Sequence, residues 1–150
     1  MGYVEDIRKA MGKKALILNS AGIILLNDSR EVLLQFRRDT NNWGWPGGYM
    51  EPGETFEDTI KREMKEEMKI RPENLRLLGV YSGPLFYHEY PNGDKVYSVV
   101  ALYTADRFWG EIKPDNKEIN RVEFFQPDKI PDNTTKVTKM LLEEYNNFSL

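Results

Sequence analysis

Residues 47–70 read GGYMEPGETFEDTIKREMKEEMKI, a glycine pair and a turn followed by a segment rich in carboxylates. Apolar side chains recur every four residues in the second half of this stretch, at Phe56, Ile60, Met64 and Met68. That spacing is typical of one buried face of a helix. Thr55 and Asp58 stand at the N-cap and third positions of a capping box. The stretch therefore predicts a turn that leads into an amphipathic helix.

Three glutamates of this helix lie beside its apolar face. At about 100° per residue, Glu63 and Glu67 project one turn apart at the border of that face, and Glu66 flanks them. Burying an unpaired carboxylate costs several kcal/mol, so crowded carboxylates at such a border need a cation. Oxygen ligands, with no cysteine and one histidine in the chain, favour Mg²⁺ or Mn²⁺ over zinc. Arg62 can orient one of the acids.

The spacing of these residues resembles the Nudix box, G-x5-E-x7-R-E-U-x-E-E-x-G-U, where U is aliphatic. Here Gly48 is followed by five residues, Glu54, seven residues and then REMKEEMKI at 62–70. One fixed position differs, because Lys69 stands where the family has glycine. That glycine normally ends the helix in the left-handed region, where a lysine costs roughly 1 kcal/mol. We therefore expect a different local end for this helix.

The resemblance implies a fold and a reaction. The fold is α/β, the Nudix α/β/α sandwich around a mixed β-sheet, as one domain over residues 1–150. The reaction is Mg²⁺-dependent hydrolysis of a pyrophosphate bond in a nucleoside diphosphate linked to a moiety X. Glu63 and Glu67 would hold the metal, and Glu66 would share it or accept the proton of the attacking water. Glu54 would be a further ligand or orient the substrate; the general base stays unassigned because clustered acids titrate together.

Residues before the box are candidates for binding phosphate and metal. Arg37 and Arg38 end a predicted strand just ahead of the glycine pair, where they could bind phosphate oxygens in bidentate geometry. The alternative is a surface arginine paired with an acid. Trp43 begins a W-x-x-P-G-G segment that resembles the approach to the box in many Nudix proteins, and we take Trp43 and Gly48 as candidates for substrate binding. Glycines at 47 and 48 let backbone approach a ligand closely, and the Gly47 carbonyl could complete the metal shell.

Residues after the box are weaker candidates. Tyr87 belongs to an aromatic cluster that could stack on a base, although aromatic residues on strands are more often core. His88, the single histidine, is more typical of a structural hydrogen bond than of catalysis. By the resemblance, Glu118 matches a loop glutamate that reaches the metal or acts as base; otherwise it is solvated. Pro84 and Tyr87 each approximate a family rule, one for ADP-ribose and one for dinucleoside polyphosphates, so the substrate stays open.

The remaining segments follow from periodicity and turn residues. Helices are expected over 2–11, as a packing or dimer element, and over 134–146. Residues 20–22 are expected to break two short strands at 15–19 and 23–27, and residues 91–94 to form a hairpin turn. The other expected strands span 32–38, 75–81, 96–105 and 122–125, with a turn-rich segment at 39–46.

The amino-acid composition restricts the kinds of binding partner that we expect. Twenty-one basic and 24 acidic residues give a net charge of −3, so no basic field would hold a nucleic acid polymer. We expect a small-molecule nucleotide as partner, a possible homodimer, and no membrane span. The absence of cysteine fits a reducing cytoplasm and argues against a Nudix-like isoprenyl diphosphate isomerase. Two alternatives are a non-catalytic nucleotide-binding regulator and a calcium-binding or purely structural acidic helix.

Overall fold

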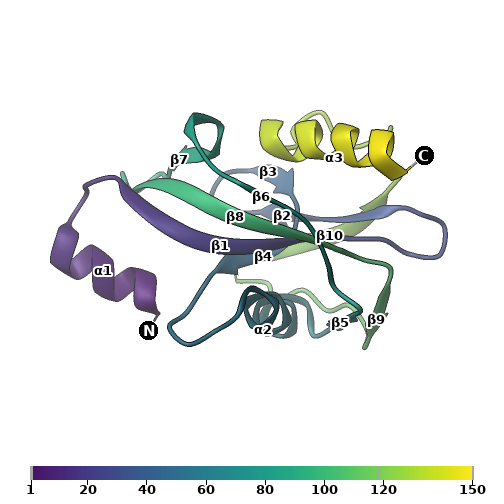
Figure 1. Ribbon diagram of the computed structural model, residues 1–150, viewed down its shortest axis with the longest axis horizontal. Coiled ribbons are helices and arrows are strands. Elements are labelled where there is room, and N and C mark those ends of the chain that lie inside the picture. Colours follow the sequence, from purple (N-terminus) through teal and green to yellow (C-terminus); the bar gives the residue numbers. More distant parts are fainter. Residues whose placement is uncertain (1, 118, 150) are drawn as a thin grey trace.

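The computed structural model describes residues 2–117 and 119–149 (Figure 1). The helices are α1 (Tyr3–Met11), α2 (Phe56–Met68) and α3 (Lys136–Ser149), with a short 3-10 turn η1 (Pro84–Phe86). The strands are β1 (Leu16–Leu25), β2 (Val32–Arg37), β3 (Asn42–Gly44), β4 (Gly47–Tyr49), β5 (Arg71–Glu73), β6 (Arg76–Tyr81), β7 (Tyr87–Glu89), β8 (Lys95–Ala105), β9 (Arg107–Trp109) and β10 (Ile119–Phe125). Within the described ranges, each helix is too short or too polar to reach across a bilayer.

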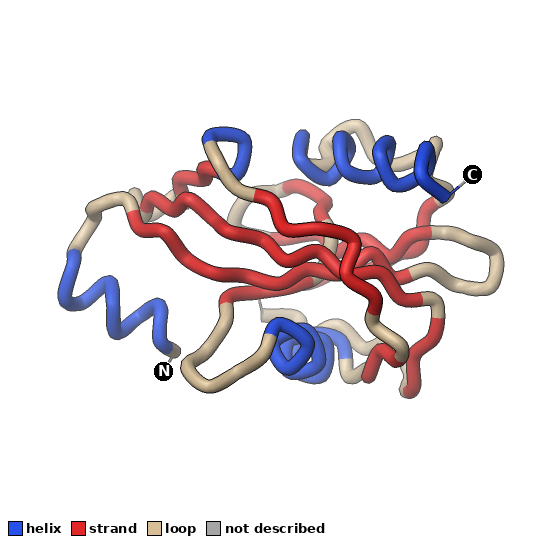
Figure 2. The backbone as a smooth tube through the Cα atoms, viewed as in Figure 1, coloured by secondary structure: helices blue, strands red, loops and turns tan. Residues whose placement is uncertain are grey.

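The strands form a mixed main sheet and a smaller antiparallel sheet between α2 and α3. The main sheet has the order β4-β1-β8-β6, and β7 also pairs with β8. Strands β1 and β8 are parallel, whereas the other pairs in this sheet are antiparallel. A second sheet has the order β10-β2-β3, and β5 pairs with β9. Figures 1 and 2 show α2 on one side of these sheets and α3 on the other, which confirms the predicted α/β/α architecture.

The apolar face predicted for α2 is the one that the fold buries. Ile60, Met64 and Met68 are fully buried and pack against Ile23 of β1 and neighbouring residues of β8. A second core cluster joins the opposite side of the sheets to Leu141 of α3. Apolar residues thus fill both interfaces of the sandwich, and burying each large side chain contributes about 1.5–3 kcal/mol.

The predicted break between two short strands is wrong. Strand β1 runs without interruption from Leu16 to Leu25. Ser20, Ala21 and Gly22 pair with β8 on one side and with β4 on the other, so the sheet itself holds them extended. A small residue is required at one of these positions, because a Cβ on Gly22 would lie 2.6 Å from the indole nitrogen of Trp45. The predicted turn at 91–94 does connect β7 to β8 as an antiparallel hairpin.

The expectation of an altered helix end at Lys69 is also wrong. Lys69 adopts the left-handed conformation itself, with φ 63° and ψ 30°, and its N–H bonds to the carbonyls of Met64 and Lys65. The helix therefore ends as it would with glycine. The next residue, Ile70, is 2% exposed and belongs to the core beneath α2. Burial of that side chain offsets the roughly 1 kcal/mol that the lysine backbone costs in this region.

Candidate active site

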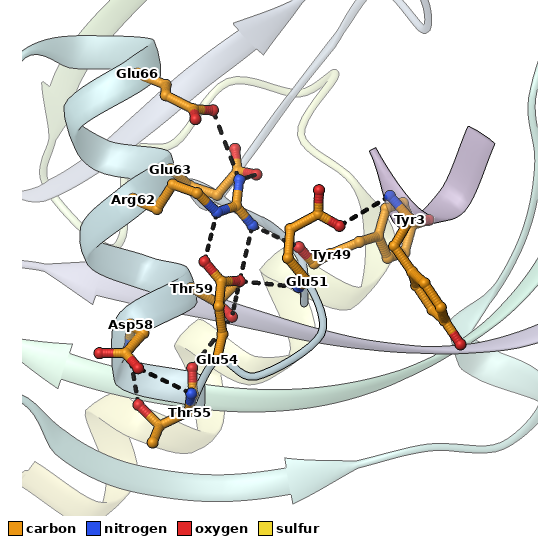
Figure 3. A network of polar contacts seen from close by, with 10 residues as sticks. All are labelled: Tyr3, Tyr49, Glu51, Glu54, Thr55, Asp58, Thr59, Arg62, Glu63 and Glu66. Carbon is orange, nitrogen blue, oxygen red and sulfur yellow. Dashed lines mark hydrogen bonds and ion pairs between the residues drawn. The ribbon is translucent and has the colours of Figure 1, made fainter. Parts of the chain in front are cut away.

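Helix α2 starts where the capping box was predicted. The Thr55 hydroxyl accepts a hydrogen bond from the Asp58 N–H, and the Asp58 carboxylate accepts one from the Thr55 N–H, both at 3.0 Å. These bonds satisfy two N–H groups that would otherwise lack partners at the start of the helix. The capping box fixes where the helix begins, and therefore which side chains point towards β4 (Figure 3).

Arg62 is the centre of the polar network in Figure 3. Its guanidinium donates to both oxygens of Glu54, at 2.6 and 3.1 Å, and to Glu63 Oε1 at 2.8 Å. It also donates to the carbonyl of Tyr49 at 2.9 Å and forms a longer ion pair, 3.6 Å, with Glu66. One arginine thus gathers three of the box glutamates and ties them to β4. The hydrogen bonds from Arg62 lower the pKa of Glu54 to about 2, and those to Glu54 and Glu63 raise the pKa of Arg62.

The glycine pair brings the β4 backbone against Glu63. A Cβ on Gly48 would lie 2.4 Å from the Glu63 carboxyl carbon and from Oε1, so no other residue fits without moving that carboxylate. A Cβ on Gly47 would lie 2.2 Å from the carbonyl oxygen of Ala21 on the adjacent strand. Both glycines are therefore needed for close packing within the protein, and the predicted approach of this backbone to a ligand stays a prediction.

The other two glutamates of the box differ in exposure. Glu67 is 5% exposed, whereas the Glu66 side chain is 59% exposed. Among the described residues, no group of three or more acidic, histidine or cysteine side chains is arranged to hold a metal ion. Glu118, the expected loop ligand, lies outside the described residues. The donors that α2 and β4 do present, carboxylates and a backbone carbonyl, are oxygens, which fits a hard divalent ion.

Arg37 is the last residue of β2, and it is close enough to α2 to be influenced by the charge of Glu67. Its guanidinium pairs in bidentate fashion with Asp39, at 3.1 and 3.2 Å. Burial acts to lower the pKa of Arg37, but the bonds to Asp39 and the charges of Asp39, Tyr90 and Glu67 outweigh it, so the pKa is raised. The ion pair anticipated as the alternative to phosphate binding is thus present in the structure. The neighbouring Arg38 is exposed.

The two aromatic candidates lie in different environments. Trp43 is 4% exposed and packs edge-to-face against Phe36 and Phe125. It is therefore a core residue and presents no free ring face to a base. Tyr87 is 38% exposed and leans against Tyr97, with ring centroids 4.9 Å apart. Of the two, Tyr87 is the one with an accessible ring.

A contact between two tyrosines, one of them a member of the predicted aromatic cluster, connects the site to the β7–β8 hairpin. The hydroxyls of Tyr49 and Tyr90 lie 2.7 Å apart, although these residues are 41 positions apart in the chain. His88 packs edge-to-face on Tyr90, with ring centroids 4.4 Å apart, and burial lowers the pKa of its imidazole. Aromatic clustering near 86–90 was visible in the sequence, but no local pattern indicates the contact with Tyr49.

Comparison with known proteins places this arrangement in a family. The NUDIX domain family model matches residues 17–145. An ADP-ribose pyrophosphatase from Methanocaldococcus jannaschii is 40% identical over 129 residues, covering 83% of this chain and 72% of that protein. The crystal structure of a MutT NUDIX hydrolase from Burkholderia pseudomallei is 27% identical, with a TM-score of 0.72 over 85% of this chain and 96% of that one.

The chain belongs to the Nudix family, and it is a Nudix pyrophosphohydrolase. Some relatives are much longer. The NAD-capped RNA hydrolase NudC of Pseudomonas syringae is 32% identical over 127 residues, which cover 82% of this chain but 42% of that protein. The chain therefore spans about two fifths of the length of that relative. Helix α1 precedes the residues that the family model matches.

Proposed function

We propose that this protein hydrolyses the pyrophosphate bond of a nucleoside diphosphate linked to a moiety X, with ADP-ribose as the leading substrate. The observation that carries the proposal is the Arg62 network, which binds Glu54 and holds Glu63 beside the β4 backbone at Gly48. The 40% identity to an ADP-ribose pyrophosphatase supports the choice of substrate. Nucleoside triphosphates and dinucleoside polyphosphates are the next substrates to test.

The proposed metal ligands are oxygens on α2, on β4 and on Glu118. Glu63, Glu67 and the Gly47 carbonyl would hold Mg²⁺ or Mn²⁺, with Glu66 and Glu118 as further ligands. The bound ion would supply charge neutralisation at the pyrophosphate and lower the pKa of a water molecule. Arg62 holds the Glu63 carboxylate in one orientation, so it is a positioning residue for this site.

Exposed groups are assigned to the proton transfer and to the substrate. Of the three box acids on α2, Glu66 is the most exposed to solvent, which supports a role for it in accepting the proton of the attacking water. Arg38 would bind phosphate oxygens with its exposed guanidinium. Arg37 would contribute Nη1, because its Nε and Nη2 already donate to Asp39. The accessible ring of Tyr87 would stack on the base.

Replacement of single box acids tests the proposal. Glu66→Gln should lower kcat for ADP-ribose by at least about 10²-fold, the usual effect of losing an acid–base group. Glu67→Gln should lower it at least as much, because the metal that neutralises the pyrophosphate charge would lose a ligand. The assay follows Mg²⁺-dependent formation of AMP and ribose 5-phosphate, the two products of pyrophosphate cleavage. Glu57→Gln removes an exposed acid from the first turn of the same helix and is the matched control. Near-wild-type turnover in both site variants would refute the assignment.

The alternative, a non-catalytic nucleotide-binding regulator, gives a different result in the same experiment. Such a protein would bind ADP-ribose by calorimetry and leave it intact in the presence of Mg²⁺ or Mn²⁺. The calcium-binding or purely structural helix would ignore the nucleotide altogether. The complete set of box acids favours the enzyme over both alternatives.

A further inference from the structure

Helix α1 lies outside the residues matched by the family model, yet it contacts the loop that leads into α2. None of its residues is buried. Val4 and Ile7 pack on a small apolar cluster that includes Leu16 and Leu18 of β1. This contact is too limited to make α1 part of the main core. The position of α1 therefore depends on the polar contacts at its two ends.

The C-terminal end of α1 is fixed to the β7–β8 turn. Arg8 donates to the carbonyls of Gly12, Lys14 and Lys95, so one side chain ends the helix and joins it to the start of β8. Lys13 donates to Asp94 at 2.8 Å. These bonds hold the far end of α1 on an element that belongs to the main sheet. The C-terminal end of α1 therefore has a fixed position relative to the main sheet.

The N-terminal end of α1 meets the loop before α2. The backbone N–H of Tyr3 donates to Glu51 Oε2 at 3.0 Å, as Figure 3 shows. Tyr3 is the first residue of the helix, where backbone N–H groups have no partner within the helix. A carboxylate at this position is also favoured by the positive end of the helix dipole. Glu51 thus links two elements that are 48 positions apart in the chain.

Glu51 is in turn bonded to the Arg62 network. Its backbone N–H donates to Glu54 Oε1 at 2.8 Å, and the Glu54 N–H donates back to the Glu51 carbonyl at 3.1 Å. Glu54 holds Arg62, and Arg62 holds Glu63 beside Gly48. A continuous run of hydrogen bonds therefore leads from the first residue of α1 to a carboxylate of the candidate active site.

A pocket of about 300 Å³, open to solvent, lies where α1, β1 and this loop meet, lined among others by Tyr3, Ile17, Asn19, Met50 and Pro52. Solvent therefore reaches part of the surface between α1 and the loop. The hydrogen bond from Tyr3 to Glu51 is therefore well placed to set the position of the loop.

We propose that α1 is a positioning element for catalysis, which acts through the Tyr3 N–H and the Glu51 carboxylate to hold the 50–55 loop and, through it, Glu54, Arg62 and Glu63. Glu51 is a positioning residue, because it touches none of the reacting groups. The inference rests on the proposed function for its kinetic consequence. Its structural consequence, an ordered 50–55 loop, does not require a substrate.

A proline at position 3 removes the N–H donor together with the tyrosine ring. Tyr3 occupies the first helical position, where proline is favoured because its missing N–H has no partner within the helix. Tyr3→Pro should therefore keep α1 and delete its bond to Glu51. Tyr3→Ala removes the half-exposed ring but keeps the N–H, so it is the matched control. Glu51→Ala deletes the same bond from the other side and does not depend on how proline is tolerated.

The kinetic readout is a double-mutant cycle in the full chain. Tyr3→Pro and Glu51→Ala should each lower kcat roughly three- to tenfold, the range for loss of one hydrogen bond, with KM nearly unchanged. The double variant should be no slower than the slower single variant, since both changes delete one interaction. Tyr3→Ala should match the wild type. Losses that multiply in the double variant, or a Tyr3→Pro enzyme with wild-type kcat, would overturn the proposal.

Hydrogen exchange provides a readout that is independent of turnover. Without substrate, the backbone amides at positions 51 and 54 should exchange faster in Tyr3→Pro and Glu51→Ala than in the wild type or Tyr3→Ala. Unchanged exchange at both amides would exclude a role of α1 in ordering the loop. A wild-type protein that hydrolyses no member of the substrate panel would instead refute the proposed function, and the exchange result would still decide the role of α1.

Discussion

At the scale of single residues, Arg62 determines how the box acids are arranged. Its bidentate contact with Glu54 and its bond to Glu63 use the planar fork of the guanidinium, which a lysine cannot reproduce. The Arg62 side chain is 27% exposed and those of Glu54 and Glu63 are each 16% exposed, so the network is partly shielded from solvent. Because they are partly shielded, the ion pairs of this network contribute to the stability of the fold as well as to the positions of the box acids.

The lowered pKa of Glu54 predicts how the stability depends on pH. The pKa is about 2 in the folded protein, chiefly because Arg62 donates to the carboxylate, against a usual value of 4.5. A carboxyl that is harder to protonate when folded stabilises the folded state above pH 4.5, and this contribution is lost as the pH falls towards 2. The difference in free energy of unfolding between wild type and Glu54→Gln should therefore be full at pH 6 and shrink at pH 3.

Urea unfolding at pH 6, 4.5 and 3 measures this difference. Glu57→Gln provides the baseline, because this exposed side chain has no bond to Arg62 among the contacts of the described residues. A Glu54→Gln penalty that stays constant from pH 6 to pH 3 would mean that Arg62 does not hold the Glu54 carboxylate in its charged form.

At the scale of elements, the end of α2 leads to a stability prediction. Lys69 has φ 63°, a conformation that costs a side chain about 1 kcal/mol and glycine almost nothing. Lys69→Gly should therefore raise the free energy of unfolding by about 1 kcal/mol and Tm by about 2–4 °C for a domain of this size. Thermal and urea unfolding measure both quantities. Lys69→Ala keeps the strain and should give no gain; equal stabilisation by both variants would contradict the explanation.

Sequence reasoning was reliable for α2 and less so for β1, for one physical reason. The start and buried face of α2 depend on residues within one or two turns of each other, such as Thr55 with Asp58. The continuity of β1 depends instead on pairing with β4 and β8, which are distant in the chain. The end of α2 was mispredicted for the same reason. The backbone preference of lysine disfavours the left-handed conformation of Lys69, and burial of the following Ile70 imposes it.

At the scale of the whole molecule, the fold joins residues that no local pattern connects. Parallel pairing of β1 with β8 carries the β7–β8 hairpin towards β4, so that the hydroxyl of Tyr90 meets that of Tyr49. Arg37 reaches the same region from the end of β2. The box residues on α2 could be predicted from the sequence because a single helix presents them. For Arg37 the sequence left two alternatives, phosphate binding or an ion pair with an acid. The Tyr49–Tyr90 contact required the complete topology.

The proposed metal site predicts that the stability of the whole molecule depends on divalent ions. An ion that binds only the folded state adds about 2.7 kcal/mol when its free concentration is 100 times Kd. For a domain of this size that corresponds to an increase in Tm of about 5–11 °C. Thermal unfolding with and without Mg²⁺ or Mn²⁺ measures the shift. Glu67→Gln should reduce it strongly, whatever the Tm of that variant without metal.

Glu57→Gln should keep the full shift, because its carboxylate lies on the exposed part of the first turn of α2. The comparison uses shifts rather than Tm values, since Glu67 is buried and its replacement also alters packing. If the metal raises the Tm of Glu67→Gln and of the wild type by the same amount, the ion binds elsewhere. The acids of α2 would then serve the Arg62 network rather than a metal. A loss confined to Glu67→Gln would instead assign the stabilising ion to the buried end of the box, beside the carboxylate that Arg62 holds against Gly48.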